Sequence, residues 1–127
     1  MSQRSEIGAI GEEKAREWLV KLGYTIRETN YKKRYGEIDI IAEKQGTLYF
    51  IEVKTNKYYP ESAFPPEIRI NAKKARNLKK ICETYLWETH VSRDQKWQID
   101  VISVILDESG SLKDIQHFEN AIFGEPY

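Results

Sequence analysis

The sequence predicts a single α/β domain that spans residues 1–127, and three observations lead to this fold class. The chain has 127 residues, which is the size of one ordinary domain. Apolar residues recur at helical spacing in one segment near the start and in another after the middle of the chain, whereas β-branched and aromatic residues alternate in the segments between and after them. No internal repeat, low-complexity tract or break in composition divides the chain.

The segment Ser5–Leu22 is predicted to form the first helix, and Gly23 ends it. Its apolar stripe consists of Ile7, Gly11, Ala15, Trp18, Leu19 and Leu22. Glu12 falls at the border of this stripe, where a solvated side chain is the ordinary expectation. Gly8 and Gly11 are poor helix residues, but they would let another backbone or a ligand come close to that border.

The next segment, Tyr24–Asn30, alternates as a first strand does, and a basic loop is predicted after it. In that loop Lys32, Lys33 and Arg34 are bracketed by two tyrosines. Cations bind phosphates and tyrosine rings can stack on bases, so this loop could hold nucleic acid. Basic loops are also common on solvated surfaces, and the position just before an acidic hairpin is what favours the binding role.

The segment Gly36–Lys54 is predicted to be a β-hairpin around which the rest of the chain is organised. Two runs rich in Ile, Val, Phe and Tyr flank a short polar segment that contains Gly46. If the turn is centred on Gln45 and Gly46, Asp39 lies opposite Glu52 on the partner strand. The same register places Glu37 opposite Lys54, on the same face.

Two carboxylates opposite each other predict a metal site. Directly opposed strand residues have Cβ atoms about 4.5 to 5.5 Å apart. At that distance Asp39 and Glu52 repel each other, and a divalent cation together with the ammonium of Lys54 would compensate them. The alternative is a solvated charged face with a Glu37–Lys54 ion pair. That alternative leaves two like charges opposed without any gain, so the metal site is favoured.

The cysteine and histidine content and the apolar runs indicate which metal ion the site would hold and in which cellular compartment the protein is expected. The single cysteine, Cys82, excludes an intrachain disulfide, and the two isolated histidines, His90 and His117, argue against a zinc site. Oxygen ligands favour Mg²⁺ or Mn²⁺. The N-terminus lacks the apolar core of a signal peptide, and no apolar run is long enough to span a membrane, so a soluble cytoplasmic protein without a membrane partner is expected.

The second half of the chain is predicted to add a helix and two strands. Prolines in Thr55–Pro66 predict an exposed loop at the mouth of the site. Asn71 is the expected N-cap of a helix that runs to about Leu86. After a polar connection, Trp97–Leu106 is a long strand, and Leu112–Phe118 could return beside it as a short one.

Charge is unevenly distributed along the chain. The net charge is zero, yet residues 1–82 contain 17 Lys and Arg against 11 Asp and Glu, and residues 83–127 contain 3 against 9. Six cations and no acid lie in the twelve residues that begin at Arg69: Arg69, Lys73, Lys74, Arg76, Lys79 and Lys80. Surface helices usually interleave acids with bases, so this run favours phosphate contact over ordinary solvation.

Several of these residues together resemble a known family. Asp39 followed by Glu52 and Lys54 resembles the Asp…Glu-x-Lys signature of restriction-endonuclease-like nucleases, and Glu12 matches the helix-borne acid of their resolvase-like branch. More closely, nearly the whole chain is similar to the YraN-type family of small bacterial proteins. The motifs are Gly8-x-x-Gly11-Glu12, Gly23-Tyr24, Asn30, Gly36-Glu37-Ile38-Asp39, Glu52-Val53-Lys54 and Asp100-Val101-Ile102.

The resemblance implies a mixed central sheet flanked by helices, in the order α-β-β-β-α-β, and a Mg²⁺-dependent endonuclease that acts on DNA, including branched or damaged DNA. The metal ligands would be Asp39, Glu52, the backbone carbonyl of Val53, and Glu12. Lys54 would orient or polarise the attacking water.

Two departures and two alternatives accompany this interpretation. Ile38 stands where many such nucleases have proline, and Gln98 stands where relatives often have a basic residue. A non-catalytic module that keeps the nuclease fold to bind nucleic acid or protein is the competing function. A small-molecule hydrolase is less favoured because the sequence has no nucleophile elbow or histidine base. Whether the chain forms a homodimer stays open.

Overall fold

The computed structural model describes residues 6–57 and 72–121 and arranges them as one five-stranded sheet with two helices. The elements are α1 (Glu6–Lys21), β1 (Thr25–Lys33), β2 (Gly36–Lys44), β3 (Thr47–Lys57), α2 (Ala72–Glu88), β4 (Lys96–Leu106) and β5 (Leu112–Phe118). The strands follow their order in the chain, and β3–β4 is the parallel pair among antiparallel ones. The predicted α/β fold with a mixed central sheet flanked by helices is therefore confirmed.

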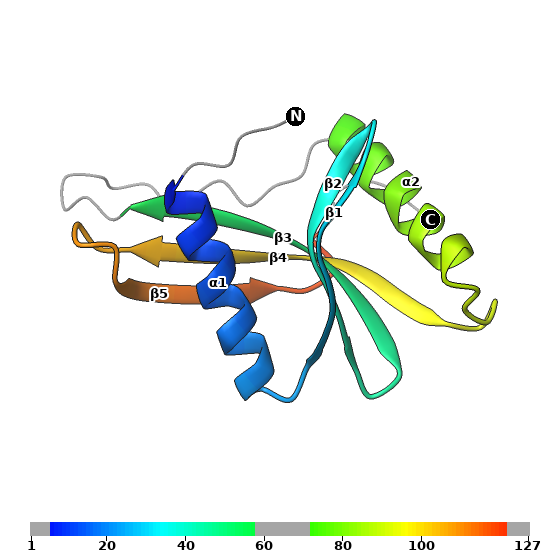
Figure 1. Ribbon diagram of the computed structural model, residues 1–127, viewed down its shortest axis with the longest axis horizontal. Coiled ribbons are helices and arrows are strands. Elements are labelled where there is room, and N and C mark those ends of the chain that lie inside the picture. Colours follow the sequence, from blue (N-terminus) through cyan, green and yellow to red (C-terminus); the bar gives the residue numbers. More distant parts are fainter. Residues whose placement is uncertain (1–5, 58–71, 122–127) are drawn as a thin grey trace.

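The two helices pack on different apolar clusters of the sheet. Residues of β3 alternate between them, because Phe50 packs in the cluster that contains the buried face of α2, whereas Ile51 packs in the cluster that contains the buried face of α1. In Figure 1, α1 crosses the sheet over β3, β4 and β5, and α2 lies beside the far end of the β1–β2 ribbon. The sheet thus separates the helix that carries Glu12 from the helix that carries the run of cations.

The hairpin turn predicted at Gln45 and Gly46 is confirmed. Both residues have positive φ, 50° and 82°, as a type I′ turn requires. Five residue pairs, from Lys44–Thr47 to Ile40–Ile51, keep the predicted register.

The pairing of β2 with β3 ends at Ile40–Ile51, so the predicted pairs Asp39–Glu52 and Glu37–Lys54 do not form. From this point β2 stays paired with β1 alone, as far as Lys33–Gly36. The physical reason is that β2 changes the helix against which its isoleucines pack. Ile40 packs in the cluster below α1, whereas Ile38 packs in the cluster against α2. Figure 1 shows the β1–β2 ribbon turning away from β3 toward α2.

Two strands are longer than predicted. The expected basic loop after Asn30 is wrong for residues 31–33, which continue β1 because they pair with the start of β2. The expected loop after Lys54 is wrong for residues 55–57, which continue β3 in parallel register with β4. The rest of that predicted loop and the expected N-cap Asn71 lie outside the described residues. The short strand expected at Leu112–Phe118 is confirmed as β5.

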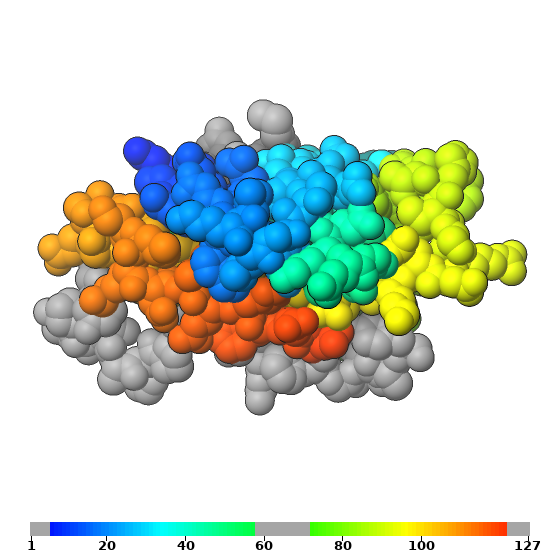
Figure 2. Space-filling model, turned by 90° about the horizontal axis from the view of Figure 1, so that it is seen from below, coloured from blue at the N-terminus to red at the C-terminus, as the bar shows by residue number. Residues whose placement is uncertain are grey.

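Figure 2, seen from below, shows α1 and β5 side by side, with the C-terminal part of α2 and residues 89–95 toward one end of the molecule. Neither helix of the described residues is long and apolar enough to cross a membrane.

Candidate active site

Asp39 lies where β2 separates from β3. Its Oδ2 accepts a hydrogen bond from the backbone N–H of Val53 at 2.7 Å, in the stretch where β2 and β3 are no longer paired. Asp39 lines a pocket of about 410 Å³ that we call the acidic pocket. The lining residues are Gly36, Glu37, Asp39, Glu52, Val53, Lys54 and Lys74. Of the predicted site residues, Asp39, Glu52, Val53 and Lys54 therefore lie together at the opening between the two strands, and Glu12 does not line this pocket.

The environment of Asp39 raises the pKa of its carboxyl group to about 7. Burial is the largest cause, and the nearby carboxylates of Glu12, Glu52 and Glu37 add to it. The hydrogen bond from Val53 acts in the opposite direction. An acid held near neutrality in this way is typical of functional sites, because folding alone gains nothing from the repulsion.

Only one of the two carboxylate oxygens of Glu52 has a partner among the described residues. Its Oε1 forms an ion pair with the Nζ of Lys74 at 2.8 Å, and its side chain is 12% exposed while that of Lys74 is 50% exposed. Its other oxygen, Oε2, is buried and accepts no hydrogen bond within the described part of the chain. A buried carboxylate oxygen without a donor is costly, and a bound cation would satisfy it.

Lys54 follows Glu52 by two residues in β3, so the two side chains leave the strand on the same face. Both lie in the acidic pocket. Because β3 continues to Lys57 in register with β4, this part of the site stands on a paired strand rather than on a loop.

Glu12 reaches the other side of Asp39 from α1. It is buried, 9% exposed, and its Oε1 accepts a hydrogen bond from Nδ2 of Asn30 at 3.0 Å. The solvated side chain expected at the border of the helix is therefore wrong. Glu12, Asn30 and Asp39 line a second pocket of about 300 Å³, so Asp39 separates the two pockets and lines both.

Gly11 explains how α1 comes so close to the sheet. A Cβ atom at this position would lie 1.9 Å from Oγ1 of Thr55 in β3. The helix can pack here because glycine has no side chain. The prediction that this glycine allows a close approach is confirmed, and the approach brings the next residue, Glu12, to Asp39.

The oxygen atoms around Asp39 are of the kind that bind a hard divalent cation, although they do not form a complete metal site as they stand. Within residues 6–57 and 72–121, no three His, Cys, Asp or Glu side chains form a ready-made metal site. The oxygen ligands beside the opening are mainly carboxylates, which stand next to the ammonium groups of Lys54 and Lys74. One buried carboxylate oxygen, Oε2 of Glu52, has no donor among the described residues. Such oxygen donors favour Mg²⁺ or Mn²⁺, and Mg²⁺ needs few of them because it keeps several of its waters.

The cations predicted on the second helix lie partly beside this pocket. Lys74 lines it, and Lys73 and Lys74 both line an adjoining cavity. The Nζ of Lys80 lies 4.6 Å from the centroid of the Tyr35 ring. Arg76 is exposed and Lys79 half-buried on the same helix, whereas Arg69 lies outside the described residues.

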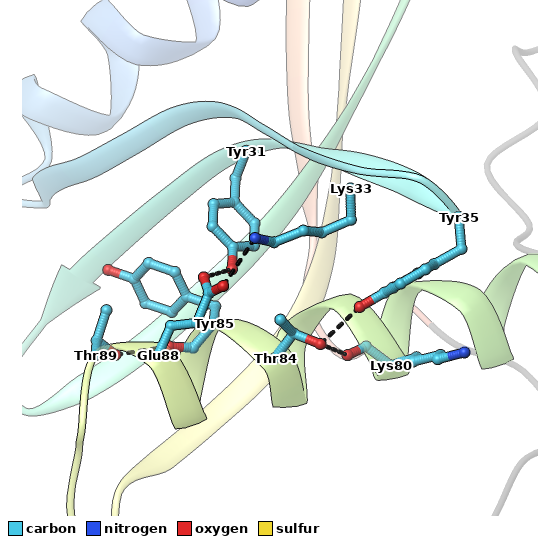
Figure 3. A network of polar contacts seen from close by, with 8 residues as sticks. All are labelled: Tyr31, Lys33, Tyr35, Lys80, Thr84, Tyr85, Glu88 and Thr89. Carbon is cyan, nitrogen blue, oxygen red and sulfur yellow. Dashed lines mark hydrogen bonds and ion pairs between the residues drawn. The ribbon is translucent and has the colours of Figure 1, made fainter.

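The basic segment before the hairpin is arranged differently from the prediction. The Nζ of Lys33 forms an ion pair with Glu88 at 2.9 Å and lies 4.9 Å from the centroid of the Tyr31 ring, whose hydroxyl donates to the same glutamate. Figure 3 shows these three residues meeting at the C-terminal end of α2. Lys33 thus bridges β1 and α2, while Lys32 and Arg34 are exposed.

Two contacts of the site were not predicted. Asn30 is part of the quoted motif, but its role as the partner of Glu12 depends on a contact between α1 and β1. The ion pair between Lys74 and Glu52 likewise joins residues far apart in the chain. A conformational signal at Asn30 is its positive φ of 51°, which asparagine tolerates better than most residues.

Another buried acid, Asp100, lines neither pocket and stabilises the sheet. It is fully buried, and its Oδ1 accepts hydrogen bonds from the side chain of Gln98 at 2.9 Å and from the backbone N–H of Asn120 at 3.0 Å. Its Oδ2 is hydrogen-bonded to Nε2 of His117 at 2.7 Å. Gln98, the departure from a basic residue, therefore binds Asp100. These contacts tie β4 to β5 and its end.

Comparison with known proteins finds relatives along most of the chain. The profile of the "Uncharacterised protein family UPF0102" matches residues 11–104, from the end of the glycine motif in α1 to β4. A UPF0102 protein of Dictyoglomus thermophilum is 40% identical over 116 residues, covering 91% of this chain and 96% of the relative. One of Alkaliphilus oremlandii is 40% identical over 119 residues (91% and 97%), and one of Parabacteroides distasonis is 32% identical over 123 residues (97% and 97%). The chain therefore belongs to the family UPF0102, the YraN-type family that its motifs resemble.

Proposed function

We propose that this protein is a metal-dependent endonuclease that hydrolyses phosphodiester bonds in DNA. The observation that supports the proposal is that Glu52 and Glu12 flank Asp39 from the two pockets that it lines, where the pKa of Asp39 is raised to about 7. Three carboxylates brought together in a partly buried site are costly for folding, and a divalent cation offsets that cost.

The cation would be Mg²⁺ or Mn²⁺, held by Asp39, Glu52, Glu12 and the carbonyl of Val53. The N–H of Val53 points to Asp39, and in a paired strand the N–H and C=O of one residue point to the same side, so the carbonyl faces this opening as well. When bound, such a cation polarises a phosphoryl oxygen and makes a water nucleophilic at neutral pH.

The two lysines would act on the phosphate and the water. Lys54 shares a face with Glu52, so its ammonium can orient the attacking water and stabilise negative charge that develops on the phosphoryl group. Lys74 forms an ion pair with Glu52 and is half exposed. When a cation binds Glu52 instead, the ammonium of Lys74 can turn to a DNA phosphate.

The basic part of α2 would hold the DNA backbone beside the acidic pocket. The residues are Lys73, Lys74, Arg76, Lys79 and Lys80, with Lys32 and Arg34 exposed near the tip of the β1–β2 ribbon. Phosphate contacts of this kind position a duplex without reading its sequence. The resemblance to resolvase-like nucleases supports branched or damaged DNA as the substrate.

The test is cleavage of single-stranded, duplex and four-way DNA by the pure protein with Mg²⁺, Mn²⁺ or a chelator. We expect cleavage that requires the cation. The substitutions Asp39→Asn, Glu52→Gln and Lys54→Met should each lower the rate by roughly 100-fold or more, since each removes a group that acts on the transition state. Asp114→Asn and Lys96→Met remove the same kinds of charge from exposed positions elsewhere and should leave the rate unchanged.

Equal cleavage by the wild type and the three site variants would contradict the proposal. Metal-independent binding of DNA without any cleavage would instead support the non-catalytic binding module.

A further inference from the structure

A cavity of about 300 Å³ adjoins the acidic pocket, and none of the proposed metal ligands lines it. It lies between the start of β2 and the first turns of α2, and it shares Gly36, Glu37 and Lys74 with the acidic pocket. We call it the tyrosine pocket. Its other lining residues are Tyr35, Lys73, Asn77, Leu78 and Ile81.

The tyrosine pocket combines an apolar floor with polar groups at its rim. Leu78 and Ile81 are 3% and 0% exposed, so they form a buried apolar surface. Asn77 adds an amide with two donors and an acceptor. Lys73 and Lys74 are exposed cations on the same helix. A nucleobase needs an apolar or aromatic surface for its face and hydrogen-bonding groups for its edge, and its phosphate needs cations.

The ring of Tyr35 is held in place before any ligand binds. Its hydroxyl is hydrogen-bonded to Oγ1 of Thr84 at 2.7 Å, and the Nζ of Lys80 lies over the ring. Figure 3 shows the ring lying along α2 between these contacts. Gly36, the next residue, comes close to α2, because a Cβ atom there would lie 3.0 Å from Cδ1 of Ile81 and its φ of 143° favours glycine. A preformed ring costs less entropy when a base stacks on it.

We infer that the tyrosine pocket receives one unpaired nucleobase next to the phosphodiester held at the acidic pocket. The face of a base is exposed only when the base is out of the helical stack, and leaving the stack costs least at an unpaired or damaged position. The protein therefore selects nucleic acid that contains a displaced base. This inference rests on the nucleic-acid binding of the proposed function, and it does not require cleavage.

The test is equilibrium binding in a chelator, where no metal-dependent cleavage can occur. Two short labelled duplexes are compared, one fully paired and one with a single extra 2-aminopurine nucleotide. We expect the wild type to bind the second duplex about 5- to 150-fold more tightly, the range that base stacking on an aromatic side chain supplies. The fluorescence of 2-aminopurine should change upon binding.

The variants separate the ring from the general surface. Tyr35→Leu should bind both duplexes with the affinity of the wild type for the paired one, and Tyr35→Phe should keep the preference. Trp87→Leu is the matched control, because Trp87 is an aromatic residue of α2 that is 78% exposed and lies outside the pocket. Circular dichroism verifies that each variant is folded.

Equal affinity of the wild type for both duplexes would overturn the inference, as would a preference that survives in Tyr35→Leu. Selective binding together with absence of cleavage in Mg²⁺ would support the inference and count against the nuclease. Failure to bind either duplex would overturn the proposed nucleic-acid function and this inference with it.

Discussion

At the scale of single residues, Asp39 shows how one carboxyl group can be held in place and yet be electrostatically unfavourable. The Val53 N–H fixes its position at 2.7 Å, where strand pairing has ended. Burial and three neighbouring carboxylates nevertheless raise the pKa of Asp39 to about 7. The protein without a cation therefore becomes less stable when this group ionises.

We expect the pH dependence of stability to reveal this cost. The pKa of Asp39 is 3.8 in the unfolded chain and about 7 in the folded one, so between these values the folded state holds a proton that the unfolded state has lost. The free energy of unfolding should fall as pH rises from about 4 to about 7, by at most about 4 kcal/mol, and then level off. Asp39→Asn should remove this decline, so that in a chelator at pH 8 the variant is more stable than the wild type.

Urea denaturation of both proteins at several pH values measures the effect, and the difference between them cancels the titration of all other groups. Added Mg²⁺ should stabilise the wild type at pH 8 but stabilise the variant far less, because a ligand that binds only the folded state shifts the equilibrium toward it. A difference that does not change with pH would show that Asp39 has an ordinary pKa.

At the scale of secondary-structure elements, the site depends on how closely α1 approaches β3. The contact between Gly11 and Thr55 leaves no room for a methyl group, since three atoms of Thr55 would lie within 2.7 Å of it. Glu12, the next residue, is buried by the same approach and held by Asn30. The packing of the helix and the position of its acid are therefore coupled.

We expect Gly11→Ala to destabilise the protein and to weaken metal binding together. Alanine favours a helix by roughly 1 kcal/mol over glycine, but overpacking costs about 1–3 kcal/mol, so the clash should win. Thr55→Ala removes two of the three clashing atoms and should restore part of the loss in the double variant. Thermal unfolding and Mn²⁺ titration measure the two effects, and Glu17→Ala, at an exposed site of α1 away from both pockets, is the control. Full stability of Gly11→Ala would show that α1 can shift freely.

Local patterns predicted the elements well because their causes are local. The turn at Gln45 and Gly46 set the register of the hairpin, and five pairs follow it. Helical periodicity predicts α1 and α2 correctly, whereas the predicted loops at residues 31–33 and 55–57 are strands. Those residues are strands because they pair with segments elsewhere in the sheet, which a local pattern does not reveal.

The arrangement of the site was predictable only in part, for the same reason. The sequence pattern brought Asp39, Glu52 and Lys54 together, and they do line one pocket. The turn of β2 away from β3 depends on the packing of Ile38 against α2 and of Ile40 below α1, so the separation of Asp39 from the strand ladder was missed. The Glu12–Asn30 and Glu52–Lys74 contacts also join distant segments.

At the scale of the whole molecule, a net charge of zero provides no overall attraction to a polyanion. The attraction must come from where the charges lie. Residues 83–127 contain only three cations, Arg93, Lys96 and Lys113, whereas the helix α2 presents five in its first nine residues. Cations close to the DNA release counterions from it, and cations elsewhere do not.

This difference predicts which charges control the salt dependence of DNA binding. Changing Lys73, Lys79 and Lys80 to Gln should lower the slope of log affinity against log salt by about 0.9 for each phosphate contact that is lost, and should weaken binding accordingly. Changing Arg93, Lys96 and Lys113 to Gln alters the net charge equally and should leave the slope unchanged. Fluorescence anisotropy over a range of salt concentrations measures both.

If the slope fell equally in the two triple variants, binding would respond to the total charge of the protein rather than to the face of α2. If only the α2 variant lost slope, the phosphates would lie along that helix, beside the acidic pocket where the cleavage is proposed.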